Sequence, residues 1–169
     1  QKHNPNVPNI AGKLFRPEFR DLKRARAFWR LVFEKTDEVR CIYSCQTITP
    51  DDFSLDHFLP WSFVAHDLLW NIIPTPRPVN SSKGSLLPDI SLYFDGLARL
   101  QYRSLQIVAQ SRHPKLLEDH LLLLKSSSVQ ELREIRFEQF WQVLHDTIVP
   151  QAQIARNMGF QGNWRYSNQ

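Results

Sequence analysis

Hydrophobic positions divide the chain into a first helical segment, a mixed middle and a long helical remainder. Between Pro17 and Lys35 apolar residues recur at steps of three and four, which predicts a helix over about residues 17–36. Residues 1–16 are rich in Pro and Asn, and we expect them to form an extended arm. The apolar positions of the predicted helix are Leu22, Ala25, Phe28, Leu31 and Val32.

The next stretch has the composition of short strands separated by turns. β-branched and aromatic residues flank the turn-like sequences "SCQT" and "TPDD". We therefore expect strands near residues 39–43, 46–48 and 53–57.

A proline-rich loop is expected after these strands. Four prolines between residues 60 and 78 exclude a long helix and leave room for a short turn at residues 66–71. Farther on, "NSSKGSLLP" offers Asn80 or Ser81 as the N-cap of a short helix that ends near Gly84.

From Asp89 onward the pattern is helical, and residues 90–160 are predicted to form a helical scaffold. One helix opens with a capping box made by Ser128 and Glu131. An apolar and aromatic stripe follows at helical spacing, which indicates packing against a core. Its members are Phe137, Phe140, Trp141, Leu144 and Ile148. The predicted fold class is α+β, with residues 1–169 forming one mainly helical domain around a small β element.

Composition and charge narrow the class of protein. Hydrophobic residues make up 42% and charged residues 22%, as in a globular protein, and a net charge of +4 favours anionic partners. No apolar run approaches membrane-spanning length and no signal sequence opens the chain, so we expect a cytoplasmic protein without a membrane partner. Cys41 and Cys45 are too few for a four-cysteine site, and we expect no structural zinc. Because the chain begins with Gln1, we also expect a processed protein or a fragment of a longer one.

The pair Asp56 and His57 ends the third predicted strand and is the first candidate for chemistry. Hydrolysis of a phosphodiester needs a base that deprotonates water and a cation that neutralises the growing charge. His57 can serve as the base, while Asp56 and Asn80 offer the oxygen ligands that Mg²⁺ prefers. Adjacent strand residues serve one site only if the chain turns there, which Pro60 favours. Taken singly, each of these polar residues also fits a turn or a helix cap.

The spacing of the polar residues resembles that of the HNH nuclease family. An Asp-His pair, Asp56 and His57, closes a strand, Asn71 follows fourteen positions after His57, and Asn80 follows nine positions later. These steps, with the flanking "DHFLPWS", "WN" and "NSSKGSLLP", are similar to the HNH domain of RNA-guided CRISPR nucleases over about residues 40–89. The resemblance implies a ββα-metal core at residues 39–89 that holds one divalent cation between two strands and a short helix.

The resemblance also implies a role for each residue. His57 is expected to be the general base, and Asp56 and Asn80 to hold Mg²⁺ or Mn²⁺. Asn71 is expected to fix the loop through hydrogen bonds from its side chain to the backbone, and Lys83 to contact a phosphate of the nucleic acid. The last motif position is Asn rather than His, which leaves the choice of metal open.

Other polar and aromatic residues of the loop rank lower. His66 is an alternative base, but nothing in the sequence orients it. We interpret Asp67 as a turn or cap residue rather than a ligand, although it lies close enough to the motif in sequence to merit a test. We interpret Trp61 and Trp70 as aromatics that pack the loop, with stacking on a nucleic-acid base as the alternative.

The sequence therefore predicts a magnesium-dependent DNA endonuclease that nicks one strand per motif. We expect it to be the nuclease effector of a larger protein or complex that acts on foreign DNA, with other domains or subunits selecting the target. A homing or packaging nuclease also fits. The alternatives from other classes are a non-catalytic module that binds nucleic acid or protein, and a metal nuclease that acts on RNA.

Overall fold

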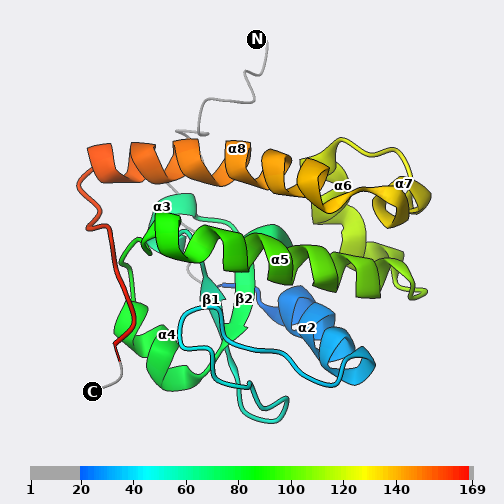
Figure 1. Ribbon diagram of the computed structural model, residues 1–169, viewed down its shortest axis with the longest axis horizontal. Coiled ribbons are helices and arrows are strands. Elements are labelled where there is room, and N and C mark those ends of the chain that lie inside the picture. The colour runs from blue at the N-terminus through cyan, green and yellow to red at the C-terminus, as the bar shows by residue number, and fades with distance from the viewer. Residues whose placement is uncertain (1–19, 168–169) are drawn as a thin grey trace.

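The structure is a computed structural model and describes residues 20–167. Two long helices, α5 (Ile90–Ala109) and α8 (Phe137–Asn157), run side by side over a small sheet, with α2 and α4 at its flanks (Figure 1). The shorter helices are α2 (Lys23–Lys35), α3 (Trp61–Val64), α4 (Arg77–Lys83), α6 (Glu118–Leu124) and α7 (Val129–Glu134). Two 3₁₀ turns, η1 (Leu69–Asn71) and η2 (Pro114–Leu117), complete the helical elements of the described chain.

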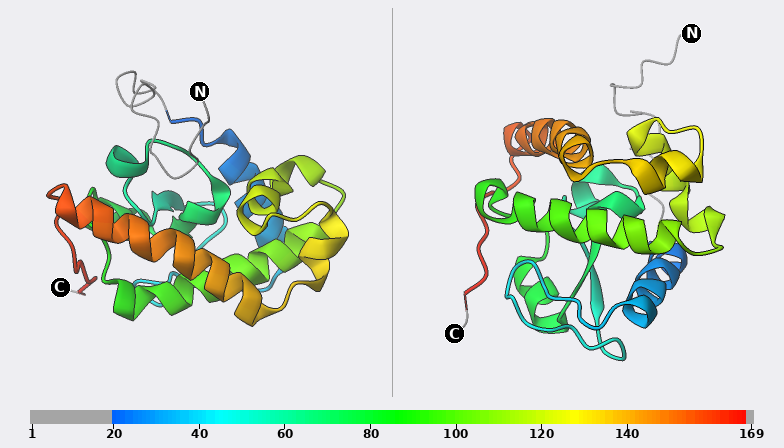
Figure 2. Two further views of the ribbon diagram at one scale, coloured as in Figure 1. Left: turned by 90° about the horizontal axis from the view of Figure 1, so that it is seen from above. Right: turned by 45° about the vertical axis from the view of Figure 1, so that its right-hand side comes forward.

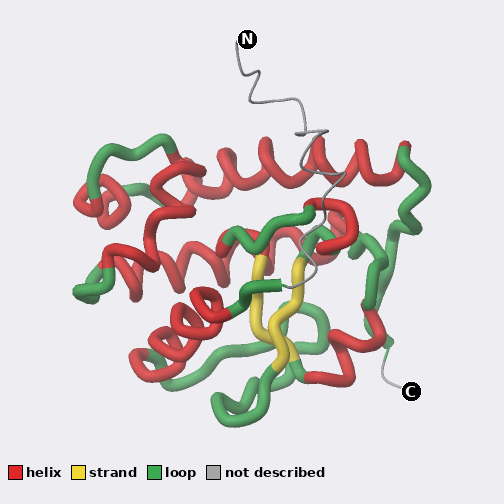
Figure 3. The backbone as a smooth tube through the Cα atoms, turned by 180° about the vertical axis from the view of Figure 1, so that it is seen from behind, coloured by secondary structure: helices red, strands yellow, loops and turns green. Residues whose placement is uncertain are grey.

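The sheet consists of β1 (Ser54–His57) and β2 (Ile72–Thr75), which pair in antiparallel orientation. The register runs from Ser54 opposite Thr75 to His57 opposite Ile72. Figure 3 shows both strands near the centre of the molecule, with helices around them. Because α4 follows β2 directly and packs against β1, the order β1, β2, α4 forms the predicted ββα unit. The fold is thus α+β, as the sequence predicted.

The strand that pairs with β1 differs from the sequence prediction. The strand expected at 53–57 is confirmed, whereas those expected at 39–43 and 46–48 are wrong, since these residues form turns and an isolated bridge between Arg40 and Thr47. The true partner, β2, lies in the stretch that we expected to be a loop. Pro74 is tolerated there because a two-stranded sheet has a free edge on each strand, where a missing N–H costs no ladder bond.

Two helix starts also differ from the prediction. Helix α2 begins at Lys23 rather than at residue 17, and the arm expected at residues 1–16 lies outside the described residues. Helix α4 begins at Arg77, so Asn80 lies within the helix instead of capping it. Prolines at the start of α4 fit this position, because the first helical N–H groups have no partner within the helix. Gly84 ends α4 with φ of 50°, as predicted.

The helical scaffold departs from the sequence pattern at one break. The segment after Ser128 divides into α7 and α8, because Ile135 adopts an extended conformation with ψ of 133°. Ser128 caps α7 by accepting a hydrogen bond from the backbone of Glu131, as predicted. The stripe on α8 packs inward, with Phe140, Leu144 and Ile148 buried.

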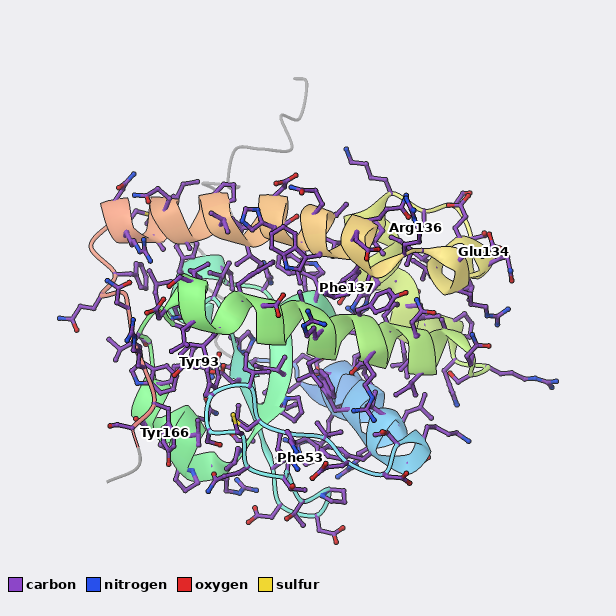
Figure 4. All side chains as sticks on the ribbon, viewed as in Figure 1. Phe53, Tyr93, Glu134, Arg136, Phe137 and Tyr166 are labelled. Atoms are coloured by element: carbon purple, nitrogen blue, oxygen red, sulfur yellow. The ribbon has the colours of Figure 1, made fainter. Side chains whose placement is uncertain are left out.

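The segment after α8 returns along the ββα unit (Figure 2). Leu87 N–H donates to Gln161 O at 2.8 Å, and Trp164 N–H donates to Leu87 O at 2.9 Å. Farther along, Tyr166 N–H donates to the hydroxyl of Tyr93 at 2.9 Å, and Figure 4 labels both residues at this side of the molecule. These bonds tie the end of the described chain to the residues that follow α4.

No helix within residues 20–167 has the length and apolar character needed to cross a bilayer.

Candidate active site

A pocket of about 220 Å³ lies where β1, α3 and α4 meet. Asp56 and His57 line it from the end of β1, and Asn80 lines it from α4. The structure therefore brings together both members of the Asp-His pair and the second Asn, and α3 begins directly after Pro60, which also lines the pocket. Larger depressions of about 620 and 570 Å³ along α2 and α5, and one of about 260 Å³ beside Arg77, contain none of these residues. The chemistry of the lining residues, and not the volume, therefore marks the site.

The Asp56 carboxylate is 2% exposed and is held by two donors. Lys83 Nζ donates to Oδ1 at 3.1 Å, and the Tyr43 hydroxyl donates to Oδ2 at 2.7 Å. Burial, followed by the charge of Asp56, raises the pKa of Tyr43 well above its ordinary value, so the phenol keeps its proton. Because each carboxylate oxygen can accept two hydrogen bonds, Asp56 keeps acceptor capacity for a further partner.

Lys83, the last residue of α4, lies in the interior and is 1% exposed. Besides its bond to Asp56, Nζ donates to the backbone carbonyl of His57 at 2.6 Å. The sequence led us to expect this ammonium at a phosphate. The structure gives it two buried partners under the site instead, because the final turn of α4 directs it toward the end of β1.

His57 is the last residue of β1 and is buried, with Nε2 2.8 Å from Oδ1 of Asp67. Burial lowers the pKa of His57 from its ordinary value, and the adjacent carboxylates of Asp67 and Asp56 offset this only in part. The ring is therefore neutral near pH 7 and carries a lone pair, as a general base requires.

The contact of Asp67 with His57 is the feature of the site that the sequence did not predict. The sequence interpretation treated Asp67 as a turn or cap residue, since it lies ten positions from His57 in an irregular loop. Only the path of that loop brings the two side chains together.

Asn71 closes the base of the loop between the strands. It is fully buried, its Oδ1 accepts from Leu59 N–H at 2.9 Å, and its Nδ2 donates to Leu59 O at 3.0 Å. Its own carbonyl accepts from Phe58 N–H at 2.8 Å. These three bonds fix the chain directly after His57, which is the geometry expected of a residue that holds the loop.

The helical scaffold holds the same loop from the other side. Gln101 on α5 donates to the carbonyls of Leu69 and Ile72, both at 3.0 Å. Asp119 on α6 accepts from Leu69 N–H at 2.8 Å. The scaffold helices thus supply polar side chains that fix η1 and the start of β2.

Asn80 is half-buried and donates through Nδ2 to the Ser54 hydroxyl at 2.6 Å. This bond sets the plane of the amide, and no residue of the described range 20–167 donates a hydrogen bond to its Oδ1. Asp56 and Asn80 therefore offer a carboxylate and an amide oxygen to one pocket, a donor set that fits Mg²⁺ or Mn²⁺ with room for water and a phosphate. Within residues 20–167, no group of three or more His, Cys, Asp or Glu side chains is arranged to hold a metal.

The rim of the pocket carries a cation on an aromatic ring. The exposed Arg20 guanidinium lies over Trp61, 5.2 Å from the ring centroid, and both residues line the pocket.

Trp70, by contrast, is buried and packs beside His66. Burial lowers the pKa of His66 to about 4, and its Nδ1 accepts from Leu68 N–H at 3.3 Å. His66 does not line the pocket, which favours His57 as the base.

Comparison with known proteins supports this location. Residues 41–88 match the family model of the HNH endonucleases, and the match contains the two strands, α4 and all five residues singled out from the sequence. The resemblance to this family is thereby confirmed for the segment, while the specific likeness to the HNH domain of CRISPR nucleases stays a prediction. No curated protein and no solved structure matches the chain.

Proposed function

We propose that this chain is a metal-dependent endonuclease that hydrolyses DNA phosphodiester bonds and nicks one strand per site. The observation that carries the proposal is that Asp56, His57 and Asn80 line one pocket inside the segment that matches the HNH endonucleases.

The residues of the pocket divide the work of hydrolysis. His57 takes a proton from a water molecule, the water oxygen bonds to phosphorus, and the bond from phosphorus to the 3′ oxygen breaks. Arg20 at the rim is an exposed cation that can pair with a non-bridging phosphate oxygen.

Asp56 and Asn80 would hold the metal, which we propose is Mg²⁺ or Mn²⁺. When bound, such a cation supplies charge neutralisation on the phosphate and on the leaving oxygen. Lys83 and Tyr43 act beneath the pocket by holding the Asp56 carboxylate in place.

The modest charge of the chain bears on how its target is selected. A net charge of +4 is small for a protein that binds DNA tightly by itself. We infer that additional domains or subunits select the target and that the chain is the nuclease part of a cytoplasmic system acting on foreign DNA.

Cleavage assays on three polymers test the proposal. The full chain is incubated with supercoiled plasmid, single-stranded DNA and RNA, each with Mg²⁺, Mn²⁺ or EDTA. We expect nicked plasmid with either cation and none with EDTA. His57→Ala should lower the rate at least about 100-fold, since a general base contributes about 10²–10⁴-fold. His113→Ala, at an exposed histidine outside the pocket, is the matched control and should cleave normally.

Three outcomes would overturn the proposal or a part of it. If His57→Ala nicks plasmid at the normal rate, His57 is not the general base. Cleavage of RNA without cleavage of DNA changes the substrate class. Binding to DNA without cleavage under any cation indicates a non-catalytic module.

A further inference from the structure

The Asp67 carboxylate lies in the loop between α3 and η1, and both of its oxygens are engaged. Oδ1 lies 2.8 Å from Nε2 of His57, and Oδ2 accepts from the backbone N–H of Asp21 at 3.0 Å. The two partners come from β1 and from the segment before α2. Asp67 therefore links the candidate base to the entry of the first described helix.

The chemistry of this contact selects one form of the imidazole. An ionised carboxylate can only accept hydrogen bonds, so a neutral His57 bound through Nε2 must carry its proton on that nitrogen. The lone pair is then on Nδ1. No residue in the described part of the chain forms a hydrogen bond with Nδ1 of His57.

Nδ1 is the ring nitrogen that this arrangement leaves for the reaction. His57 lines the pocket, while Asp67 does not line it and engages Nε2 at 2.8 Å. A general base must direct a lone pair at the water that it deprotonates. We propose that Asp67 is a positioning residue that fixes His57 in the tautomer with Nδ1 as the base; this rests on the proposed nuclease function.

Asp67→Asn tests this role because both partners of Asp67 require an acceptor. An asparagine has one acceptor oxygen and one donor amino group. If its oxygen faces Asp21 N–H, its amino group faces Nε2 and favours the tautomer with the proton on Nδ1. The reverse orientation sets the amino group against Asp21 N–H, so that two donors meet. The variant therefore keeps the tether to Asp21 and converts the base into a donor.

The experiment measures the tautomer and the reaction in the same proteins. The full chain is labelled with ¹⁵N-histidine, and the His57 signals are assigned by their loss in His57→Gln. We expect wild-type His57 to carry the proton on Nε2 and Asp67→Asn to shift it to Nδ1. We also expect kcat to fall about 100-fold in Asp67→Asn with KM changed by less than about threefold, the pattern of a lost base.

Two further variants separate positioning from folding and charge. Asp67→Glu restores a carboxylate and should recover more activity than Asp67→Asn. Asp95→Asn removes a carboxylate from an exposed pair with Arg99 and should leave both kcat and the His57 tautomer unchanged.

Each remaining result decides one claim. A wild-type His57 protonated on Nδ1 overturns the inference, even if Asp67→Asn fails to fold. An inactive His57→Ala beside a fully active Asp67→Asn overturns the role of Asp67 and leaves the proposed function standing. A fully active His57→Ala overturns the proposed function itself.

Discussion

Replacing Lys83 by methionine tests the buried ion pair beneath the candidate site. Lys83 Nζ lies 3.1 Å from Asp56 Oδ1, with side-chain exposures of 0% and 2%. Methionine has a similar length and no charge. The change leaves the Asp56 carboxylate in the interior with the Tyr43 hydroxyl as its remaining donor among residues 20–167.

The expected cost follows from the burial of both partners. Removing one member of a buried pair leaves an uncompensated charge and costs roughly 3–5 kcal/mol. A domain of ordinary size has about 5–15 kcal/mol of stability, so the change removes a large part of it. The double variant Lys83→Met with Asp56→Asn leaves no charge of this pair in the interior. We therefore expect its loss of stability to be about 2 kcal/mol smaller than the sum of the losses in the two single variants, which is within the usual size of coupling between contacting residues.

Urea unfolding at pH 7, followed by tryptophan fluorescence and circular dichroism, measures these free energies. Lys115→Met, at an exposed lysine of η2, is the control and should change stability by less than about 0.5 kcal/mol. A loss below about 1 kcal/mol in Lys83→Met would refute the buried pair. A double variant that is as unstable as the sum of both single variants would show that the two charges do not interact.

Three other predictions concern pH, the loop and the metal. Burial lowers the pKa of His120 to about 4, so the unfolded chain takes up this proton first, near pH 6.5. The contribution of neutral His120 to the free energy of unfolding is therefore complete above about pH 6.5. It falls as the pH drops toward 4, and the loss is about 2 kcal/mol at pH 5. His120→Gln should show a smaller difference than the wild type between the urea midpoints at pH 7 and pH 5. Asn71→Ala leaves the Leu59 N–H and C=O without their partners and should lower the free energy of unfolding by about 2–4 kcal/mol, as measured by calorimetry. A change near zero would contradict the role of Asn71 in fixing the loop. Ser54→Ala removes the hydroxyl that orients Asn80 and should raise the Mg²⁺ concentration for half-maximal nicking about tenfold, whereas an unchanged titration would argue against Asn80 as a ligand.

The sequence by itself determined the class of the fold and the position of the candidate site. Hydrophobic periodicity is a local property, so it predicted that residues 90–160, which contain α5 and α8, are helical before any contact was known. The site could be found in the same way because the end of β1, the loop and α4 follow one another within the segment 41–88. The step from Asp56 and His57 to Asn80 therefore carried information about a shared pocket.

Tertiary structure alone decided the partners of these residues. Pairing of β1 with β2 depends on the path of the loop. Pro74 led us to expect a loop, because proline is disfavoured in a sheet unless it lies at a free strand edge, and only the tertiary structure shows which edge is free. Burial of Lys83 against Asp56 spans 27 positions, and the bond from Asp21 to Asp67 spans 46. Such contacts arise where separate elements pack together, and no spacing along the chain encodes them.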